Sequence, residues 1–457
     1  MRIVVLAAAL IAGGCAMIGP DYQRPASDLP ANFGEPDAGA ATIAVAPQWW
    51  NLYDDRALDE LVAAGLERNA DVRLAVARLE EAEAALREAH ATLYFPLVEG
   101  NGGATRSRAI VSGSPVVANN FTLGLSTSFE VDIWGRLRRA ERAIRNQVLA
   151  SRYGRDTVAL TLAASIARTY FAALSLDSQF AASQEIVRAA DESLTIARKR
   201  LDAGYSSALD VYQAGSLRAA AAAQAKEIAR QRSAILHQLG VLTGRLDLTL
   251  PAKEVLSLPI PPLPPAGLPS ALLERRPDVR QAEATLAAAT ERIGVAKAAQ
   301  FPTLRLTGSA GEQSPELSSL FSAGSRVWSI SGGIVGPILD GGRYKARTAQ
   351  AEAQARQAEA GYQRAVETAF REVADALSNV RLAADSETDL QARVGEARGA
   401  LRLAQLRYER GYSAYLEVLD AQRTLNDAQL AFIRNRQAYL SYTVDLMNSL
   451  GGGWNPS

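Results

Sequence analysis

The sequence predicts a mixed α/β membrane protein in which a unit of helix, two strands, long helix and helix occurs twice in tandem. Three observations lead to this prediction. A turn sequence is repeated, because GYSSALD begins at Gly204 and GYSAYLE begins 207 positions later at Gly411. Residues 121–133 alternate between apolar and polar side chains. Two proline-free runs, each of about 65 residues, would form helical paths of roughly 100 Å, far beyond the usual length in globular proteins.

The composition excludes several classes of function. Lys and Arg together number 49 and so do Asp and Glu, so the chain lacks the basic excess of most nucleic-acid-binding proteins. A single Cys and two His residues, His90 and His237, leave little material for a metal site or a nucleophile. The common catalytic motifs are also missing from the sequence. We therefore expect a protein that is not an enzyme and that uses no cofactor.

The N-terminus has the pattern of an export signal. Arg2 precedes about ten apolar residues, too few to span a bilayer as a helix but suited to the core of a signal peptide. Gly13 and Gly14 then lead directly into Cys15. This arrangement resembles a bacterial lipoprotein signal over residues 1–14, with Cys15 acylated as the first mature residue, although Ala12 stands where Leu is usual. The alternative is an ordinary secretory signal and a free Cys15.

Strands are predicted at residues 97–106, 121–133, 303–312 and 326–335. In the clearest of them, Phe121, Leu123 and Leu125 alternate with Thr122, Gly124 and Ser126. Thirteen residues exceed a usual soluble strand of about 5 to 6 but suit a tilted membrane strand of about 9 to 11. A membrane sheet must close on itself, and the smallest barrels have about eight strands, so one chain is not enough. Three chains would give twelve.

The long helices are predicted at residues 137–201 and 345–408, and shorter helices that precede the strands at 58–93 and 270–300. Small and apolar residues before each repeated turn follow the 3-4-3-4 spacing of a coiled coil: Val187, Ala190, Leu194, Ala197 and Leu201 in the first repeat. Gly204 and Gly411 are expected to adopt the left-handed conformation that ends a helix, with Ser206 and Ser413 capping the return helices. The predicted domains are an N-terminal segment (15–56), repeats 57–250 and 270–450, a Pro-rich linker (251–269) and a tail (451–457).

Several motifs together resemble the TolC-type outer-membrane efflux proteins of the lipoprotein, NodT-like branch. They are GCAMIGPDYQRP from Gly14, VDIWGRLRRA from Val131, LLERRPDVRQAEA from Leu272, LDGGR from Leu339, and RGYSAYLEVLDAQR from Arg410. The resemblance implies a homotrimer with a twelve-stranded β-barrel in the bacterial outer membrane, continued by an α-helical coiled-coil barrel in the periplasm. It further implies a passive exit duct that works with a periplasmic adaptor (membrane fusion) protein and an inner-membrane RND-type pump, anchored in outer-membrane lipid through Cys15.

The resemblance also assigns roles to residues at the two repeated turns. The hairpin tips at Gly204, Tyr205, Gly411 and Tyr412 would dock the adaptor, and the periplasmic gate would contain Asp210, Glu417, Asp420 and Tyr408. Some family members carry an Arg two residues after the second tip glycine, where this chain has Ser413. Asp210 and Glu417 have an alternative role, since a carboxylate in the first turn of a helix stabilises it, and Ser207 with Asp210 has the spacing of a capping box. Asp420 lies too far from the turn for that explanation.

Two other functions remain open at this point. A type I protein-secretion duct would share the fold, while the lipoprotein start and the RRPDV and LDAQR sequences favour efflux. A periplasmic coiled-coil structural lipoprotein without a pore is the second alternative. The alternating strands and the helix-strand-helix repeats count against it.

Overall fold

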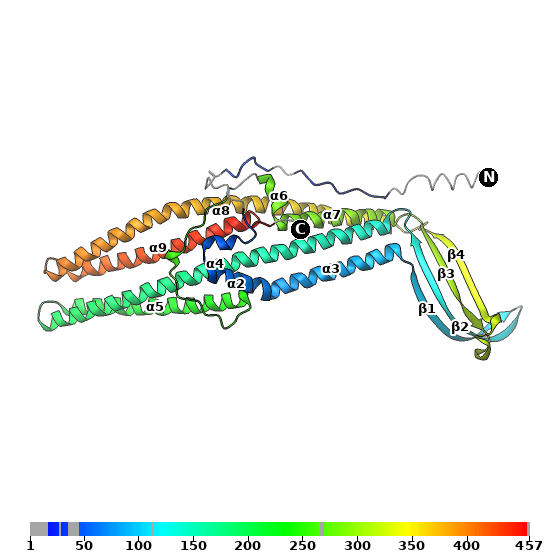
Figure 1. The fold of residues 1–457 in the computed structure, drawn as a ribbon, viewed down its shortest axis with the longest axis horizontal. Helices are drawn as coiled ribbons and strands as arrows, with labels where there is room; N and C mark the ends of the chain where they lie inside the picture. Colours follow the sequence, from blue (N-terminus) through cyan, green and yellow to red (C-terminus); the bar gives the residue numbers. More distant parts are fainter. Residues whose placement is uncertain (1–16, 27–28, 35–44, 112, 266–268, 455–457) are drawn as a thin grey trace. The chain divides into compact units, whose positions relative to one another are not determined.

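The computed structural model describes residues 17–26, 29–34, 45–111, 113–265 and 269–454 of the chain (Figure 1). The predicted lipidation residue, Cys15, lies outside the described residues. In chain order the elements are the 3-10 helix η1 (Trp49–Tyr53), α2 (Arg56–Arg68), α3 (Ala70–Tyr94), β1 (Leu97–Val111), β2 (Ser114–Val131), α4 (Arg136–Asp202), α5 (Ala208–Thr243), η2 (Val255–Ser257), η3 (Pro269–Ala271), α6 (Leu272–Arg275), α7 (Pro277–Ala298), β3 (Thr303–Ser314), η4 (Leu317–Ser319), η5 (Ala323–Ser325), β4 (Arg326–Val335), α8 (Arg343–Glu409) and α9 (Tyr415–Ser449).

The long helices confirm the duplication. Helices α4 and α8 each contain 67 residues, and both ends of α8 lie 207 positions after the corresponding ends of α4. The return helices α5 and α9 begin at Ala208 and Tyr415, which differ by the same interval. The fold is therefore mostly helical with a small sheet, built from two related halves.

The shorter helix of each repeat is broken, which the sequence analysis did not predict. Between α2 and α3, Asn69 adopts an extended conformation (ψ 137°), and its side-chain oxygen accepts the backbone N–H of Asp71 at 2.8 Å. In the second repeat, Arg276 is extended because it precedes Pro277, which begins α7. A helix-capping Asn and a proline thus interrupt the two halves at matching places.

The chain divides into two compact units, and each contains segments of both repeats. Among the described residues, the first unit holds the strands, residues 17–26, and the parts of the helices within 78–152 and 281–363. Its sheet is antiparallel throughout, in the order β1-β2-β3-β4.

The predicted starts at Leu97, Thr303 and Arg326 are confirmed, whereas β2 begins at Ser114 and ends at Val131. The expected strand residue Asp132 instead caps α4, where its carboxylate accepts the backbone N–H of Arg138 at 2.9 Å.

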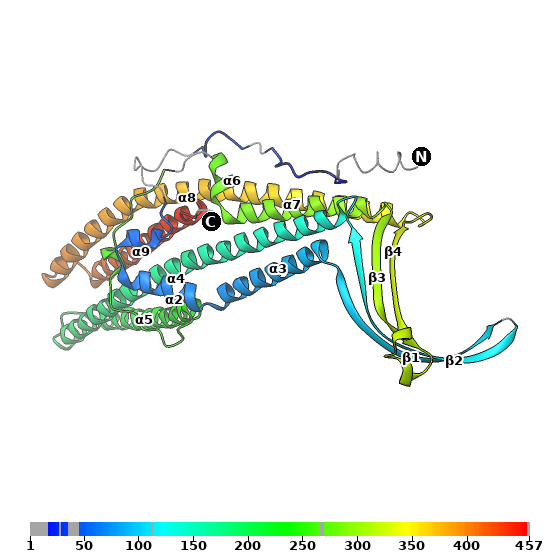
Figure 2. The same ribbon diagram turned by 45° about the vertical axis from the view of Figure 1, so that its right-hand side comes forward.

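The strand register gives the sheet one apolar and one polar face. Leu125 of β2 lies opposite Gly100 on β1 and Ala310 on β3. These three residues, and every second residue from them along each strand, form the apolar face. On the other face, Ser126 lies opposite Glu99 and Ser309. The part of the β1–β2 hairpin beyond Phe121 has no partner in β3 and extends past the other two strands (Figure 2).

A pair of glycines lets β2 and β3 approach closely. Gly124 and Gly311 are direct partners in the register. A Cβ atom on Gly311 would lie 2.4 Å from the carbonyl oxygen of Leu123, and one on Gly124 would lie 2.9 Å from that of Ala310. Only residues without a side chain fit here without a shift of the backbone.

The second unit contains the described residues within 29–77, 153–280 and 364–454. Its main core buries the aromatic rings of Trp49, Tyr53, Tyr170 and Phe171 among aliphatic residues of α2, α4, α5 and α9. The buried carboxylate of Asp55 caps α2 and accepts the Tyr170 hydroxyl and the Lys253 ammonium group, each at 2.9 Å. This one acid therefore ties α2, α4 and the Pro-rich linker together.

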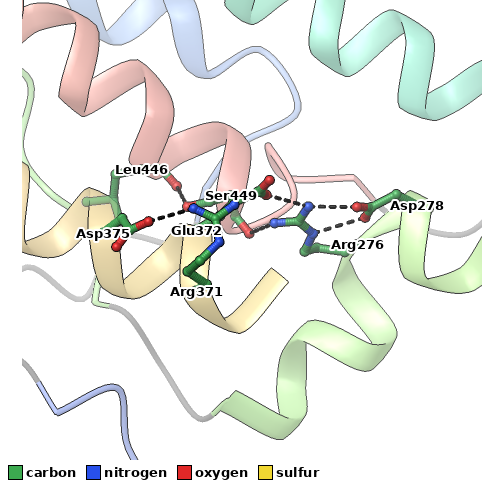
Figure 3. A network of polar contacts seen from close by, with 7 residues as sticks. All are labelled: Arg276, Asp278, Arg371, Glu372, Asp375, Leu446 and Ser449. Carbon is green, nitrogen blue, oxygen red and sulfur yellow. Dashed lines mark hydrogen bonds and ion pairs between the residues drawn. The ribbon is translucent and has the colours of Figure 1, made fainter. Parts of the chain in front are cut away.

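Arg276 connects three helices of the second unit (Figure 3). Its guanidinium donates to Asp278 at 2.7 Å and pairs with Glu372 of α8 at 2.8 Å. It also donates to the carbonyl oxygen of Ser449, in the last turn of α9, at 3.2 Å. Burial opposes ionisation of this side chain, but Asp278 and Glu372 hold the pKa of Arg276 above its usual value. A cation at this position also compensates the negative end of α9.

Candidate functional site

The two repeated turns adopt the same conformation. Gly204 and Gly411 have φ angles of 75° and 76°, in the left-handed region that side-chain-bearing residues rarely occupy. The backbone N–H of Tyr205 donates to the Arg200 carbonyl oxygen at 2.8 Å, and that of Tyr412 donates to Arg407 at the same distance. These are the six-residue bonds of a Schellman motif, so the predicted conformation of both glycines is confirmed.

The predicted capping serines were wrong. The N-cap of α5 is Ser207, whose side chain forms a reciprocal capping box with Asp210. Ser206 donates instead to the carbonyl oxygen of Ala197 at 3.3 Å. In the second repeat the N-cap is Ala414, which has no side-chain acceptor, and Ser413 lies one residue earlier. Both helices start one residue later than predicted, and the second copy has no side-chain cap.

Tyr408 lies buried between the two helical hairpins. Its ring is 5.2 Å from that of Tyr415 on α9, and the Arg200 guanidinium of α4 lies 4.4 Å from the ring centre. Arg200 also donates to the Tyr408 carbonyl oxygen at 3.1 Å. Burial raises the pKa of the Tyr408 hydroxyl, although Arg200 opposes this shift. The contacts of Tyr408 therefore join α4 to α8 and α9 within one chain.

The three acids of the predicted gate have different surroundings. Asp210 is half-buried and belongs to the capping box, so the structural role considered for it is confirmed. Glu417 is exposed in the first turn of α9 and pairs with Arg407 at 3.3 Å across the turn. Asp420 is exposed and, within the described chain, has no hydrogen-bond or ion-pair partner. Of these three acids, Asp420 is thus the one that has no partner among the described residues.

Apolar side chains project into solvent at both tips. Tyr205 and Tyr412 occupy equivalent positions in the two repeats, as do Leu209 and Leu416, and all four are between 60% and 81% exposed. The two tyrosines were predicted as docking residues, whereas the two leucines were not. The repeat carried the necessary signal, since Leu209 and Leu416 lie 207 positions apart outside the coiled-coil spacing. Exposed apolar groups that recur in both tips suit a protein-binding surface.

The polar face of the sheet is lined by hydroxyl groups. Thr307 and Ser331 share a hydrogen bond of 2.8 Å between their side-chain oxygens, and so do Ser309 and Ser329. These pairs connect β3 to β4 and leave further hydroxyl lone pairs open to water. At the end of the sheet, Glu130 forms a two-pronged ion pair with Arg136 at 2.8 Å, where β2 leads into α4. The arrangement suits a wet surface opposite a lipid-compatible one.

A metal site is not evident among the described residues, where no group of three or more His, Cys, Asp and Glu side chains could hold an ion. The described site therefore consists of two turns, exposed side chains at their tips, and a sheet with a hydroxyl-lined face.

Comparison with known proteins places these features in context. The family model described as "Outer membrane efflux protein" matches residues 61–245 and 268–452. The solvent efflux pump outer membrane protein SrpC of Pseudomonas putida is 35% identical over 98% of each chain. The cation efflux system protein CusC of Escherichia coli O6:H1 is 32% identical over 99% of each chain. The open-state outer membrane channel MtrE of Neisseria gonorrhoeae superposes with a TM-score of 0.87 at 30% identity, covering 96% of this chain and 99% of MtrE.

Proposed function

The chain belongs to the outer membrane efflux protein family, and we propose that three copies of it close into one twelve-stranded barrel through which substrates leave the cell. The protein is thus an outer-membrane efflux channel, as its relatives are. The number of copies, the partners and the roles of individual residues are the parts of this account that need experiments.

The proposal of a barrel rests on the two unpaired edges of the sheet. In the described chain β1 and β4 each pair with one strand only, yet their apolar face continues that of β2 and β3. Hydrocarbon offers no hydrogen-bond partner for such edges, so β4 of one copy must pair with β1 of another. Two copies would give eight strands and three would give twelve, and the family resemblance favours three.

The test combines mass with conductance. Light scattering in detergent should give a mass close to three chains, and the same preparation should form discrete channels in planar bilayers. A monodisperse monomer, or a trimer that never conducts, would contradict the proposal. Conduction matters because a periplasmic coiled-coil lipoprotein without a pore could also be trimeric.

The partners follow from the tips and from the relatives. SrpC is named for a solvent efflux pump and CusC for a cation efflux system. A passive duct contains no energy source, so we propose an inner-membrane pump of the RND type and a periplasmic adaptor that binds the exposed tips. Leu209→Ser with Leu416→Ser should weaken adaptor binding in a pull-down with a purified periplasmic adaptor protein of an RND-type efflux system, and leave trimerisation unchanged. Unchanged adaptor binding would argue against the tips as the docking surface.

The gate is proposed to be a ring of acids at the closed end of the helical tunnel. Asp420 supports this role because its exposed carboxylate has no partner within the described chain. Glu417 is its candidate neighbour, with Arg407 as the cation that balances it when the tips are at rest. Tyr408 would hold the hairpins together through Arg200. Three copies of Asp420 around an axis would repel one another and favour cations.

Lipidation of Cys15 remains a proposal, supported by the signal sequence and by the position of the nearby chain. Met17, two residues later, packs against Gly135, which lies between the end of β2 at Val131 and the start of α4 at Arg136. The Cys15→Ser variant should lose labelling by a palmitate analogue, whereas Cys15 in the wild type should be labelled. Labelling that survives this substitution would refute acylation at this residue.

A further inference from the structure

Residues 17–24, which we name the N-terminal strap, pack on the first unit through a series of specific contacts. The backbone N–H of Ile18 donates to the carbonyl oxygen of Trp134 at 3.1 Å. Further along, the strap contacts Arg139 of α4 and Glu283 of α7, while Glu291 of α7 pairs with Arg139. These three charged residues lie on two helices more than a hundred positions apart in sequence and far from the hairpin tips in the chain.

Arg139 is almost completely buried, at 1% exposed, and the strap supplies most of its acceptors. Its guanidinium donates to the carbonyl oxygens of Pro20 at 3.0 Å and Gly19 at 3.1 Å. It also pairs with Asp21 of the strap at 3.0 Å and with buried Glu291 of α7 at 2.9 Å. A buried cation requires compensating partners, so removal of the strap would leave Arg139 with much of its hydrogen-bonding capacity unmet.

Glu283 forms a second attachment point, eight residues before Glu291 and so a little over two turns of α7 away. Its carboxylate accepts a two-pronged ion pair from Arg24, at 2.7 and 3.0 Å, and the Tyr22 hydroxyl at 3.1 Å. Burial of Tyr22, together with the Glu283 charge, raises the pKa of that hydroxyl above its usual value. The side chains of Tyr22 and Arg24 in the strap therefore both donate to Glu283.

Glycines make the close approach possible. Gly19 has a φ angle of 110°, and a Cβ atom there would lie 2.5 Å from the Cα atom of Gly294 on α7. A Cβ atom on Gly135 would lie 2.6 Å from the Met17 side chain. The backbone of the strap thus lies directly on the helix surface, a fit that depends on shape as well as charge.

The first contacts of the strap lie where strands meet helices. Trp134 donates its indole N–H to the Pro302 carbonyl oxygen at 2.7 Å, and its ring lies 4.9 Å from that of Phe301. Tryptophan and phenylalanine at the ends of membrane strands are typical of the level of the lipid head groups. Cys15 is two residues before Met17, a span of at most about 7 Å.

We propose that Arg139, Glu291 and Glu283 form a binding site for the chain's own N-terminal strap, and that this site holds the lipid on Cys15 beside the membrane interface. The site recognises a short peptide with two free carbonyl groups, an acid and an Arg-Tyr pair, which residues 19–24 provide. The placement of the lipid rests on the proposed acylation of Cys15, whereas recognition of the strap does not.

The test measures whether the strap is docked in the full-length protein. Gln23, an exposed residue of the strap, is replaced by cysteine and labelled with a nitroxide, because acylation blocks the thiol of Cys15. The electron paramagnetic resonance spectrum should be that of an immobilised label. Glu283→Gln should raise the ratio of mobile to immobile label by about tenfold or more, since hydrogen bonds to a charged group are lost. Gly19→Ala should have the same effect through the clash with Gly294.

Gly34→Ala is the matched control. Gly34 also has a left-handed φ angle, of 76°, but a Cβ atom there would meet nothing within 4 Å. Its label spectrum should match the parent protein. An immobilised label in both Glu283→Gln and Gly19→Ala would overturn the binding site, and so would a label that Gly34→Ala mobilises equally.

A Cys15→Ser sample separates this inference from the proposed function. The strap should stay docked in it, because protein groups hold it; a mobile strap there would mean that the lipid does the holding, which would overturn the site. Mass and conductance are measured on the same samples. A docked strap in a protein that does not trimerise would contradict the proposed channel and support the strap site.

Discussion

Replacement of Arg276 by methionine should loosen the C-terminal end of α9. Methionine preserves much of the side-chain volume but donates no hydrogen bond. The buried carbonyl oxygen of Ser449 would then lose the guanidinium, and Asp278 and Glu372 would lose their shared cation (Figure 3).

The magnitude follows from the exposure of each partner. Asp278 and Glu372 are 33% and 38% exposed, so water can solvate them and their loss costs little. Ser449 is buried, and an unsatisfied buried acceptor costs about 1–3 kcal/mol. We expect a local destabilisation of about 2–3 kcal/mol, which corresponds to an increase of about 30- to 140-fold in local opening.

Hydrogen exchange of peptides that cover the end of α9 measures this opening directly. Arg371→Met is the matched control, because Arg371 lies in the same network but is 63% exposed and pairs only with Asp375 one turn away among the contacts in Figure 3. Such a pair contributes about 0.3–0.5 kcal/mol. Unchanged exchange in Arg276→Met, or equal acceleration in Arg371→Met, would refute the assignment of Arg276 as the buried link.

Three further predictions concern pH, the sheet and the gate. Burial, reinforced by Asp55, raises the pKa of Tyr170 above its ordinary value of 10.0. The protonated hydroxyl therefore stabilises the fold fully below pH 10.0, and this stabilisation is lost as the pH rises further. The melting temperature should fall above that pH, and should fall less steeply in Tyr170→Phe. Gly311→Ala should lower the temperature at which the oligomer dissociates in SDS, because the new Cβ atom would lie 2.4 Å from the Leu123 carbonyl oxygen, a clash that costs about 1–3 kcal/mol. Gly333→Ala on the same face should leave this temperature unchanged, because a Cβ atom there meets nothing within 4 Å. Asp420→Asn with Glu417→Gln should reduce cation preference, measured as the reversal potential in a salt gradient, and unchanged selectivity with a lower melting temperature would instead favour a helix-capping role.

The long helices and strands could be predicted because their signals are local and repeated. The absence of proline over about 65 residues and the 3-4 spacing give the length and seam of α4 and α8. The alternation around Leu125 gives the faces of β2. The turns at Gly204 and Gly411 follow from glycine's access to left-handed φ angles.

The breaks and pairings could not be predicted in the same way, since they depend on contacts distant in sequence. Asn69 ends α2 partly because its amide donates to the carbonyl oxygen of Leu242 on α5, at 3.0 Å. The proline after Arg276 was a visible signal that the prediction of one helix over 270–300 passed over. Arg200 gave no sign that it would lie over the ring of Tyr408, and nothing in the sequence near Arg139 indicated its burial under the strap.

Cross-linking of the two sheet edges tests the central claim most directly. Four variants each carry a cysteine at Gly332, on the apolar face of β4, and one cysteine on the same face of β1, at Val98, Gly100, Gly102 or Ala104. Four positions are used because the register between β4 of one copy and β1 of the next is unknown. Within one chain these edges are separated by three strand spacings, about 14 Å, too far for a disulfide. Oxidation should convert at least one of the four variants to a covalent trimer on a non-reducing gel, and a protein that stays monomeric in all four would contradict closure of the barrel between copies.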